Sequence, residues 1–388
     1  MNDRPPSRGH GSLAEVVPSL LAGMGVPGSV DTVGLAGPRR VCLLLVDGLG
    51  WQLLSQHRED APFLTALAAK RGPVAAGFPA TTVTSLAALG TGTPAGQHGL
   101  VGYSFAARRA HGEELLNALR WQRHGSGKPA DLRSKLTPEQ LQPERTMFER
   151  AAEAGVGVEL VVPHHHQDSG LSRAVLRGGR FHPVQALGDL VGRVLDSLRS
   201  SDRVLCYAYH ADLDALGHVH GPGSDPWRRQ LVFVDHLARM IAESLPAGSA
   251  LVVTADHGMV EIGESDKVDF DTESNLGDGV RLLGGEARVR HVYVEDGAEA
   301  DVRDRWTARL GTRAWIASRD EAIAEGWFGP KVLDRVRPRI GDLVVAGRDN
   351  LAVVRSRVEP RLSSYRGHHG SHTDMEQLIP LLVHANTD

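Results

Sequence analysis

Three short, largely apolar segments constrain the fold of this chain more than any other feature. They are Val41–Val46, Arg203–Tyr209 and Ala250–Thr254, and helical patterns separate them along the chain. An apolar run of this length is typical of a strand that other elements cover on both faces. Strands that alternate with helices predict an α/β fold, in which a mostly parallel central sheet carries helices on both faces.

The alternation extends over much of the chain and is interrupted twice. The patterns predict helices near 13–24, 51–70, 146–154 and 183–200 and from Asp225 onward, with further strands at 74–77, 156–162 and 378–383. Residues 103–143 are polar and lack strong periodicity, and residues 261–359 hold a β-α-β-like pattern of their own. We therefore expect a catalytic α/β core made of 13–102, 144–260 and 360–388, an insertion at 103–143, and a second insertion or subdomain at 261–359.

Composition and charge narrow the range of partners and compartments. The 388 residues carry a formal net charge of −4, which gives no reason to expect a nucleic acid polymer or an anionic membrane as a partner. No apolar run approaches the ~20 residues of a membrane-spanning helix. The two cysteines, Cys42 and Cys206, both lie in predicted core strands. Free buried thiols are typical of a reducing compartment, so we expect a cytoplasmic protein.

Aspartate and histidine residues follow the predicted strands where each strand ends. Asp47 comes directly after the first strand, and the Asp256-His257 pair follows the third. Asp214 and His218 lie after the second strand, in a segment that we expect to be a loop. The carboxyl ends of parallel strands share one edge of the sheet, and ligands of such folds bind there. A turn near the C-terminus adds one more histidine, for which His368 and His372 compete with His369. With His369, which only the family resemblance described below favours, the candidate set is Asp47, Asp214, His218, Asp256, His257 and His369.

The make-up of this set indicates a metal centre. Singly, each residue has a simpler explanation, because an aspartate after a strand is more often a turn or capping residue. Three aspartates and three histidines at one edge are much harder to explain in that way. Mixed carboxylate and imidazole ligands suit Zn²⁺, with Mn²⁺ as an alternative. Six ligands are enough for two divalent ions, which together can clamp the attacking and leaving oxygens of a displacement at phosphorus.

A cluster of hydroxyl residues precedes a further predicted helix. Pro79, Thr81 and Thr82 stand before apolar residues at helical spacing, which places Thr82 near the start of the helix. The free N–H groups and the positive end of the helix dipole at that place suit an anion such as a phosphate. The simpler interpretation is that a threonine here only caps the helix.

With these residues identified, the sequence resembles the alkaline phosphatase superfamily and, within it, the nucleotide pyrophosphatase/phosphodiesterase family. The resemblance rests on the order and spacing of short motifs that span the chain, whereas the two predicted insertions match much less. The motifs are Val46–Gly48, Phe78–Thr82 with Thr91-Gly92 and His98-Gly99, Asp214 with Gly217-His218 and Gly221-Pro222, Asp256–Met259, and Gly367–Gly370.

The resemblance implies a role for each matching position. Thr82 stands where the family has its nucleophile, and attack by its hydroxyl would give a covalent threonine intermediate. A threonine hydroxyl is a poor nucleophile at neutral pH unless a metal or a base activates it, which agrees with a metal centre beside it. The ligand sets that the resemblance implies are Asp47, Asp256 and His257 for one divalent ion and Asp214, His218 and His369 for the second.

Two departures from the family pattern bear on the substrate. Ser85 stands where the family's diesterases usually have an asparagine that holds a phosphoryl oxygen, so Ser85 is the candidate for that contact. No Arg or Lys lies between Gly72 and Tyr103, whereas the phosphatase branch has an arginine near its nucleophile for a doubly charged monoester. This favours monoanionic diesters, with Arg108, Arg109 or the second insertion as other sources of a cation. Tyr103 is a candidate to stack on a base or aglycone, although a lone aromatic is more often a packing residue.

The function that follows is a two-metal hydrolase that cleaves phosphodiester or pyrophosphate bonds of a small molecule such as a nucleotide. The alternatives on the same core are a phosphomonoesterase, a phosphonate hydrolase and a phosphomutase. A metal-stabilised binding or regulatory protein without turnover would also keep this core, but the intact Thr82 and the complete ligand set argue against it. His164–His166 follow a predicted strand and belong either over the site or to an exposed loop.

Overall fold

A six-stranded sheet forms the centre of the molecule. The computed structural model describes residues 10–109, 112–125, 127–273 and 275–386. The strand order is β19-β9-β1-β8-β6-β7, with bounds Leu381–Asn386, Ser249–Thr254, Arg40–Val46, Val204–His210, Gly157–Pro163 and Arg180–Val184. Five neighbouring strands are parallel, and the edge strand β19 pairs antiparallel with β9. The predicted fold class with its mostly parallel sheet is confirmed.

The three apolar segments form the buried middle of this sheet. Every residue of β8 and β9 is buried, and so is all of β1 beyond Arg40. β1 pairs in register with β8, so that Cys42 lies opposite Cys206. Both cysteines are free and fully buried. Burial on both faces explains why these strands are apolar throughout rather than alternating.

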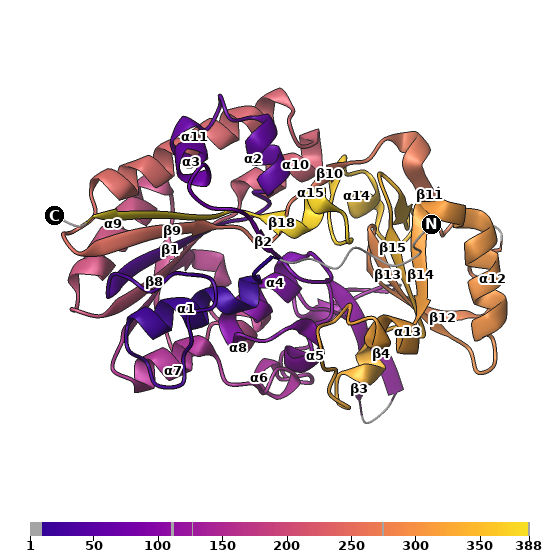
Figure 1. Ribbon diagram of the computed structural model, residues 1–388. Helices are drawn as coiled ribbons and strands as arrows, with labels where there is room; N and C mark the ends of the chain where they lie inside the picture. The colour runs from indigo at the N-terminus through magenta and orange to yellow at the C-terminus, as the bar shows by residue number, and fades with distance from the viewer. Residues whose placement is uncertain (1–9, 110–111, 126, 274, 387–388) are drawn as a thin grey trace.

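Helices cover both faces of the central sheet (Figure 1). On one face lie α3, α9 and α11, with bounds Pro62–Ala68, Leu187–Arg199 and Asp225–Glu243. On the other face lie α1, α4 and α7, with bounds Val16–Gly23, Thr82–Thr91 and Met147–Glu153. The packing of α11 follows from its sequence, because Leu231, Val234, Leu237 and Ile241 recur at helical spacing and are all buried.

A second, antiparallel sheet lies beside the central one, at the right of Figure 1. Its strand order is β12-β13-β15-β14, with bounds Val280–Glu286, Val289–Val294, Leu343–Gly347 and Ala314–Ser318. One face packs against Val302 and Trp306 of α12 (Glu299–Leu310) in a small core. The other face adds Val344 and Ala346 to the main core. This sheet belongs to the segment 261–359 that we expect to be an insertion, and the boundaries of core and insertions stay a prediction.

The segment expected to be the first insertion contains a three-stranded antiparallel sheet. Its strands pair in the order β3-β4-β5, with bounds Ser104–Arg109, Gly112–Asn117 and Gln122–Arg123. The remaining α-helices and strands are α2 (Trp51–Gln56), β2 (Val74–Ala75), α5 (Ala95–His98), α6 (Pro138–Leu141), α8 (Gly170–Val175), α10 (Asp212–His220), β10 (Val260–Glu261), β11 (Lys267–Asp269), α13 (Arg319–Ala324), β16 (Ala352–Val354), α14 (Pro360–Ser363), β17 (Gly367–His368), α15 (Asp374–Gln377) and β18 (Leu378–Ile379). Single turns of 3₁₀ helix lie at Leu13–Glu15, His164–His166, Glu264–Asp266, Gly311–Arg313 and Arg337–Arg339.

Two predicted helices have different bounds in the structure. The segment 51–70, expected to be one helix, is two, because Pro62 begins α3 and Ala61 before it has φ −136° and ψ 62°, outside the helical region. The helix expected near 183–200 begins at Leu187, because residues 180–184 form β7 at the edge of the sheet. Pro183 is tolerated in β7 because an edge strand has N–H positions that need no partner.

The segment after β8 is a helix rather than the expected loop. α10 runs from Asp212 to His220, so Asp214 and His218 stand four residues apart on one helical face. Both aspartates of its first turn lie at the positive end of the helix dipole, which favours helix formation here. Helical spacing, rather than the fold of a loop, therefore brings Asp214 and His218 together.

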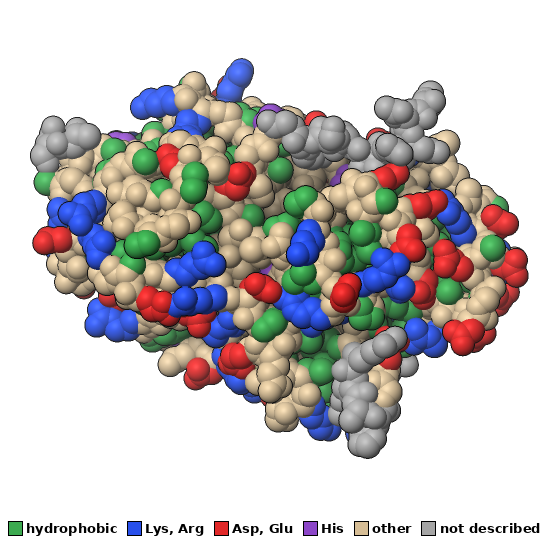
Figure 2. Space-filling view, turned by 60° about the horizontal axis from the view of Figure 1, so that its bottom comes forward, with side chains coloured by type: hydrophobic (Ala, Val, Ile, Leu, Met, Phe, Trp, Pro, Cys, Tyr) green, Lys and Arg blue, Asp and Glu red, His purple; other side chains and the backbone are tan. Residues whose placement is uncertain are grey.

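The surface carries charges of both signs. On the face shown in Figure 2, Lys and Arg side chains are interspersed with those of Asp and Glu, so neither sign dominates the field over that face. Among the described residues, no helix combines the length and the apolar character that crossing a bilayer requires.

Candidate active site

The predicted site residues lie together at the carboxyl edge of the central sheet. Asp47 follows β1 directly, and Asp256 and His257 follow β9 after one further residue. The other members come from α10, from the turn after β17 and from the start of α4, and they are Asp214, His218, His369 and Thr82. α4 and α10 lie between the central sheet and the second sheet (Figure 1).

Asp47 and Asp256 are buried beside His257. Nε2 of His257 lies 3.4 Å from Oδ1 of Asp47 and 3.4 Å from Oδ2 of Asp256. Two backbone N–H groups donate to the other oxygen of Asp256, and the Tyr209 hydroxyl donates to Oδ2 of Asp47. Burial, with the charges of Asp256 and Asp214, raises the pKa of Asp47 well above its ordinary value. The side chains around these aspartates therefore do not neutralise the negative charge of the carboxylates.

The three histidines of the set share one hydrogen-bonding pattern. Nδ1 of each ring faces a backbone carbonyl oxygen, which can only accept, so Nδ1 carries the proton. The distances are 2.9 Å from His257 to Gly258, 2.7 Å from His218 to Gly367 and 2.9 Å from His369 to Ala80. Burial, with the neighbouring His257 and His218, lowers the pKa of His369 well below its ordinary value, so this ring is neutral. Nε2 thus keeps its lone pair, as in metal-binding histidines whose other nitrogen is held by a carbonyl.

Carboxylate oxygens without hydrogen-bond partners face these lone pairs. Within the part of the chain that the structure describes, Oδ1 of Asp47, Oδ2 of Asp256 and Oδ1 of Asp214 are buried without a partner. The first two are the atoms 3.4 Å from Nε2 of His257, and the third lies 3.9 Å from Nε2 of His369. Buried anionic oxygens that face imidazole lone pairs need a cation between them. The residues present therefore fit a divalent metal.

The ligand atoms form two adjoining groups. Within each group they lie within 4.8 Å of one another, and the groups are Asp47, Asp256 and His257, and Asp214, His257 and His369. The rings of His257 and His369 are stacked with centroids 3.5 Å apart. His218 lies outside both groups, but its Nε2 is 3.3 Å from Oδ2 of Asp214. All six predicted ligands therefore lie close together, and His257 belongs to both groups.

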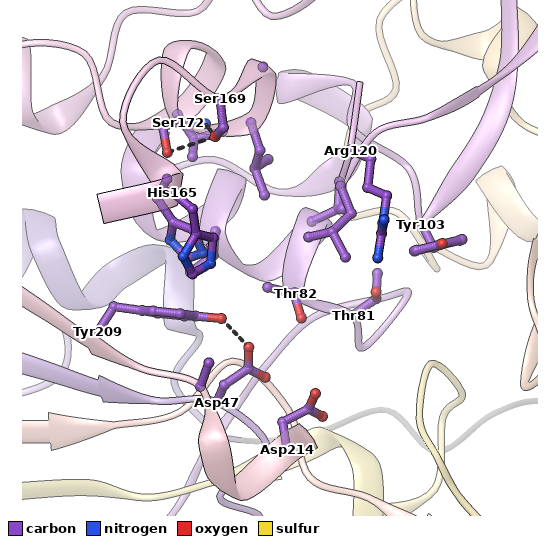
Figure 3. Close-up of a pocket in the computed structure, with 18 of the residues that line it drawn as sticks. Asp47, Thr81, Thr82, Tyr103, Arg120, His165, Ser169, Ser172, Tyr209 and Asp214 are labelled. Atoms are coloured by element: carbon purple, nitrogen blue, oxygen red, sulfur yellow. Dashed lines mark hydrogen bonds between the residues drawn. The ribbon is translucent and has the colours of Figure 1, made fainter. Parts of the chain in front are cut away.

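Thr82 is the first residue of α4, and its hydroxyl is directed toward Asp47 and Asp214 (Figure 3). Thr81 occupies the N-cap position, and its side chain forms no capping hydrogen bond with the helix. The backbone bond from Ser85 to Thr81 is the first of the helix among the described residues. The N–H groups of the first turn are therefore available to an anion, and Thr82 does not act as a cap.

A cavity of about 700 Å³ opens over these residues. Asp47, Asp214 and Thr82 lie at one end of it, and α8 and the β4–β5 turn contribute to its walls (Figure 3). Part of the wall is apolar, with the side chains of Leu86, Leu119, Leu171, Val175 and Leu176. The volume and the mixture of apolar wall and polar end suit a small organic molecule.

The two candidate substrate contacts lie differently. Tyr103 lines the cavity, and burial raises its pKa to about 12, so its phenol is neutral and able to donate a hydrogen bond. Ser85 is fully buried and does not line the cavity, and its hydroxyl has no hydrogen-bond partner among the described residues. In this arrangement Tyr103 is placed to touch a substrate and Ser85 is not.

Three further residues that line the cavity were not identified from the sequence. Tyr209 reads as one more apolar position of a buried strand, yet its hydroxyl holds Asp47. Arg120 and Glu286 line the cavity from the two segments that match the family least. A polar tip at the carboxyl end of an apolar strand was the available signal for Tyr209, whereas nothing in the sequence points to Arg120 or Glu286.

The histidine run contributes to the wall of the cavity. His165 and His166 line the cavity, and the His166 ring contacts that of Tyr209 with centroids 5.2 Å apart. Of the two interpretations of His164–His166, the structure thus supports a place over the site for two of the three rings. Arg108 and Arg109, named above as sources of a cation, have side chains that lie outside the described part of the structure.

Sequence and fold are both similar to those of known proteins. Residues 41–372 match the family model described as type I phosphodiesterase/nucleotide pyrophosphatase. The fold is similar to that of human ectonucleotide pyrophosphatase/phosphodiesterase 5, with a TM-score of 0.65, 17% identity, and 89% of this chain and 88% of that chain covered. An inactive variant of the murine protein in complex with AMP gives a TM-score of 0.65 at 16% identity, covering 90% and 89%.

A bacterial structure is similar to the same degree. Phosphonoacetate hydrolase from Sinorhizobium meliloti in complex with phosphonoacetate gives a TM-score of 0.65 at 20% identity, with 90% of each chain covered. A comparison with curated protein sequences finds no relative.

The family match spans most of the chain and includes Thr82 and all six predicted ligands. The structural likenesses show that the fold is shared. The resemblance predicted from the motifs is confirmed, and it places the chain among the phosphoryl-group hydrolases of the alkaline phosphatase superfamily. The chain belongs to the type I phosphodiesterase/nucleotide pyrophosphatase family.

Proposed function

We propose that this protein is a metal-dependent phosphodiesterase or nucleotide pyrophosphatase in which Thr82 is the nucleophile. The observation that carries the proposal is the position of its hydroxyl, with Oγ1 3.3 Å from Nε2 of His257, beside the carboxylate oxygens that lack partners. The uncapped start of α4 lies at the same place, and its N–H groups would hold the phosphoryl oxygens.

The ligand chemistry supports two divalent ions. The proposed ligands are Asp47, Asp256 and His257 for one ion, and Asp214, His218 and His369 for the other. Carboxylate and imidazole ligands together match Zn²⁺ best, with Mn²⁺ as the alternative. When bound, the ions would supply Lewis acidity and positive charge at the oxygens around phosphorus. The Tyr209 hydroxyl and the carbonyls that accept from each Nδ1 fix the orientation of the ligands.

The residues of the chain then account for two successive displacements. Oγ1 of Thr82 loses its proton to solvent and forms a bond to phosphorus, while the bond from phosphorus to the leaving oxygen breaks and that oxygen takes up a proton. Water then attacks the same phosphorus and breaks its bond to Oγ1, which restores the threonine hydroxyl. The first-turn N–H groups of α4 are positioned to stabilise the phosphoryl oxygens in both steps.

The proposed substrate is a small phosphodiester or pyrophosphate. The cavity accommodates a molecule of nucleotide size, and Tyr103 and the apolar wall offer a surface to a base or aglycone. Two of the similar structures named above hold AMP and phosphonoacetate, which are both small phosphoryl compounds. We also propose a cytoplasmic location, which the free buried thiols of Cys42 and Cys206 support.

Turnover of two aryl phosphates tests the proposal. The protein is loaded with Zn²⁺ or Mn²⁺ and assayed with bis(4-nitrophenyl) phosphate and with 4-nitrophenyl phosphate. We expect a higher kcat/KM for the diester, because the reacting group then carries a single negative charge. A higher kcat/KM for the monoester would contradict the diesterase assignment and favour a phosphomonoesterase.

A further inference from the structure

One cation of the cavity wall has a side chain without a partner among the described residues. Arg120 lines the cavity, and its guanidinium extends toward Thr81 and lies beside Tyr103 (Figure 3). It forms no hydrogen bond or ion pair with any residue that the structure describes, whereas its backbone N–H donates to Asn117. Arg120 is close enough to Tyr103 for its charge to act on the phenol. Burial has the largest effect on the pKa of Tyr103 and raises it, whereas the positive charge of Arg120 lowers it.

A second arginine in the same cavity shows the contrast. Arg133 also lines the cavity, but its guanidinium donates to both oxygens of Asp131, at 2.6 Å and 3.0–3.1 Å. It donates in addition to the backbone oxygen of Asp168. The donors of Arg133 are thus occupied within the protein, while those of Arg120 are available to a ligand.

The turn that carries Arg120 is firmly held. Residues 118–121 connect β4 to β5, and the Ala118 N–H donates to the carbonyl of Tyr103 at 2.9 Å. Trp121 is fully buried, and its indole N–H donates to the carbonyl of Leu136 at 2.6 Å. A Cβ on Gly170 at the start of α8 would lie 2.3 Å from the Trp121 side chain, so the turn and α8 are in direct contact. Arg120 is therefore presented from an ordered support, as selective binding requires.

The reacting phosphoryl group does not need this cation. Three carboxylates and two divalent ions, as proposed above, leave one positive charge at the end of the cavity. A monoanionic diester neutralises that charge by itself. The positive charge of a guanidinium further along the wall is then available to bind another, negatively charged part of the substrate.

We propose that Arg120 binds a second anionic group of the substrate, a carboxylate or a further phosphoryl group, and selects substrates that carry one. The proposal rests on the proposed function at Thr82 and adds the class of substrate. The planar fork of a guanidinium matches either oxyanion with two parallel hydrogen bonds.

A matched set of substrates isolates this role. The carboxylate arm uses 4-carboxyphenyl 4-nitrophenyl phosphate and, as its neutral counterpart, the methyl ester of that carboxylate. The phosphoryl arm uses a nucleoside triphosphate. The variants are Arg120→Gln, Arg120→Lys and, as the matched control, Arg133→Gln.

The expected loss is confined to substrates with the second charge. Arg120→Gln lowers kcat/KM for the carboxylate substrate or the triphosphate by about 10- to 100-fold, mainly because KM rises. A loss of this size corresponds to one charge-assisted hydrogen bond. The methyl ester changes by less than about threefold, because its only charge lies at the reacting phosphorus. Arg120→Lys recovers part of the loss as a point charge, and Arg133→Gln loses much less than Arg120→Gln. Whichever arm is affected identifies the second group.

A binding measurement separates this inference from the proposed function. The dissociation constants of the same ligands are measured by calorimetry in Thr82→Ala, with and without Arg120→Gln. Weaker binding of the charged ligands alone supports the role of Arg120 even if the wild-type protein hydrolyses none of them. An equal loss for the charged substrate and the methyl ester would overturn the inference and assign Arg120 to the reacting phosphoryl group. Equal losses in Arg120→Gln and Arg133→Gln would overturn it as well.

Discussion

Oγ1 of Thr82 lies 3.3 Å from Nε2 of His257, although 175 residues separate the two in the chain. The contact joins the start of α4 to the end of β9, where Asp256 precedes His257. Nε2 of His257 is itself 3.4 Å from Asp47 and from Asp256, so the hydroxyl lies beside the proposed ligands of the first ion.

The choice of His369 over its neighbour as a ligand is testable by counting bound ions. Nε2 of His369 faces Asp214, whereas Nε2 of His368 lies 3.1 Å from the carbonyl of Tyr365. We expect His369→Ala to bind fewer than two Zn²⁺ ions per chain, measured by elemental mass spectrometry after dialysis. His368→Ala is the control and keeps both ions. Two ions retained in His369→Ala would show that the second ligand set is wrong.

Tyr209 is predicted to increase the affinity for the metal by holding its ligand Asp47. Its hydroxyl donates to Oδ2 of Asp47, and Tyr209→Phe removes that bond while leaving the ring in place. We expect an affinity for Zn²⁺ that is about 10- to 100-fold weaker, as measured by competition with a chelator. Tyr207 supplies the control, because its hydroxyl is buried without a hydrogen-bond partner among the described residues and Tyr207→Phe should change the affinity little. Similar effects in both variants would count against the role of Tyr209.

Gly258 is predicted to be irreplaceable for steric reasons. A Cβ at this position would lie 1.9 Å from the carbonyl oxygen of Met375, which belongs to the backbone and cannot rotate away. Gly258→Ala should lower the free energy of unfolding by about 1–3 kcal/mol, measured by urea denaturation. Gly192→Ala on α9 is the control, because its new Cβ has no other atom within 4 Å. In that variant the free energy of unfolding should rise by up to about 1 kcal/mol. Wild-type stability of Gly258→Ala would refute the close approach.

Glu359 gives a prediction for the pH dependence of stability. Burial opposes ionisation of this carboxyl, but Arg290 and His124 outweigh it and lower its pKa to about 2 from an ordinary 4.5. A depressed pKa stabilises the fold above pH 4.5, and the stabilisation is lost as the pH falls from 4.5 toward 2. At pH 7, Glu359→Gln should cost about 3–5 kcal/mol, because it leaves Arg290 buried without its ion pair.

Thermal unfolding between pH 7 and pH 3 measures this effect. The difference between wild type and Glu359→Gln should shrink below pH 4.5. Glu243→Gln is the control, because Glu243 pairs with Arg239 at the surface and its loss should cost less than about 1 kcal/mol. A difference that stays constant down to pH 3 would contradict the lowered pKa.

The sequence was most informative where a strand fixes the position of the next residue. Asp47, Asp256 and His257 follow buried strands by one to three residues, so the parallel sheet alone brings them to one edge. The fold class followed from the same strands. The approach of Asp214 and His218 was foreseen, but its helical cause was not, because α10 is short, contains Gly217 and ends at Gly221-Pro222.

Other features depend on tertiary contacts that no local pattern encodes. Arg120 reaches the cavity because Trp121 packs against Gly170, 49 residues further along the chain. The burial of Ser85 follows from the packing of α4 against η1 (Leu13–Glu15) and its neighbours on that face of the sheet, so a motif position alone could not show that its hydroxyl is turned away from the cavity. The sequence predicts the position of side chains that follow a strand, but not of side chains whose position depends on packing between distant segments.

Covalent labelling of Thr82 tests the central claim most directly. Metal-loaded protein is mixed with bis(4-nitrophenyl) phosphate, quenched in acid during turnover, digested and analysed by mass spectrometry. We predict one 4-nitrophenylphosphoryl group on the peptide that contains Thr82, and in Thr82→Ala no label and a loss of kcat of at least about 10³-fold. A label on another residue, or wild-type turnover by Thr82→Ala, would contradict the account.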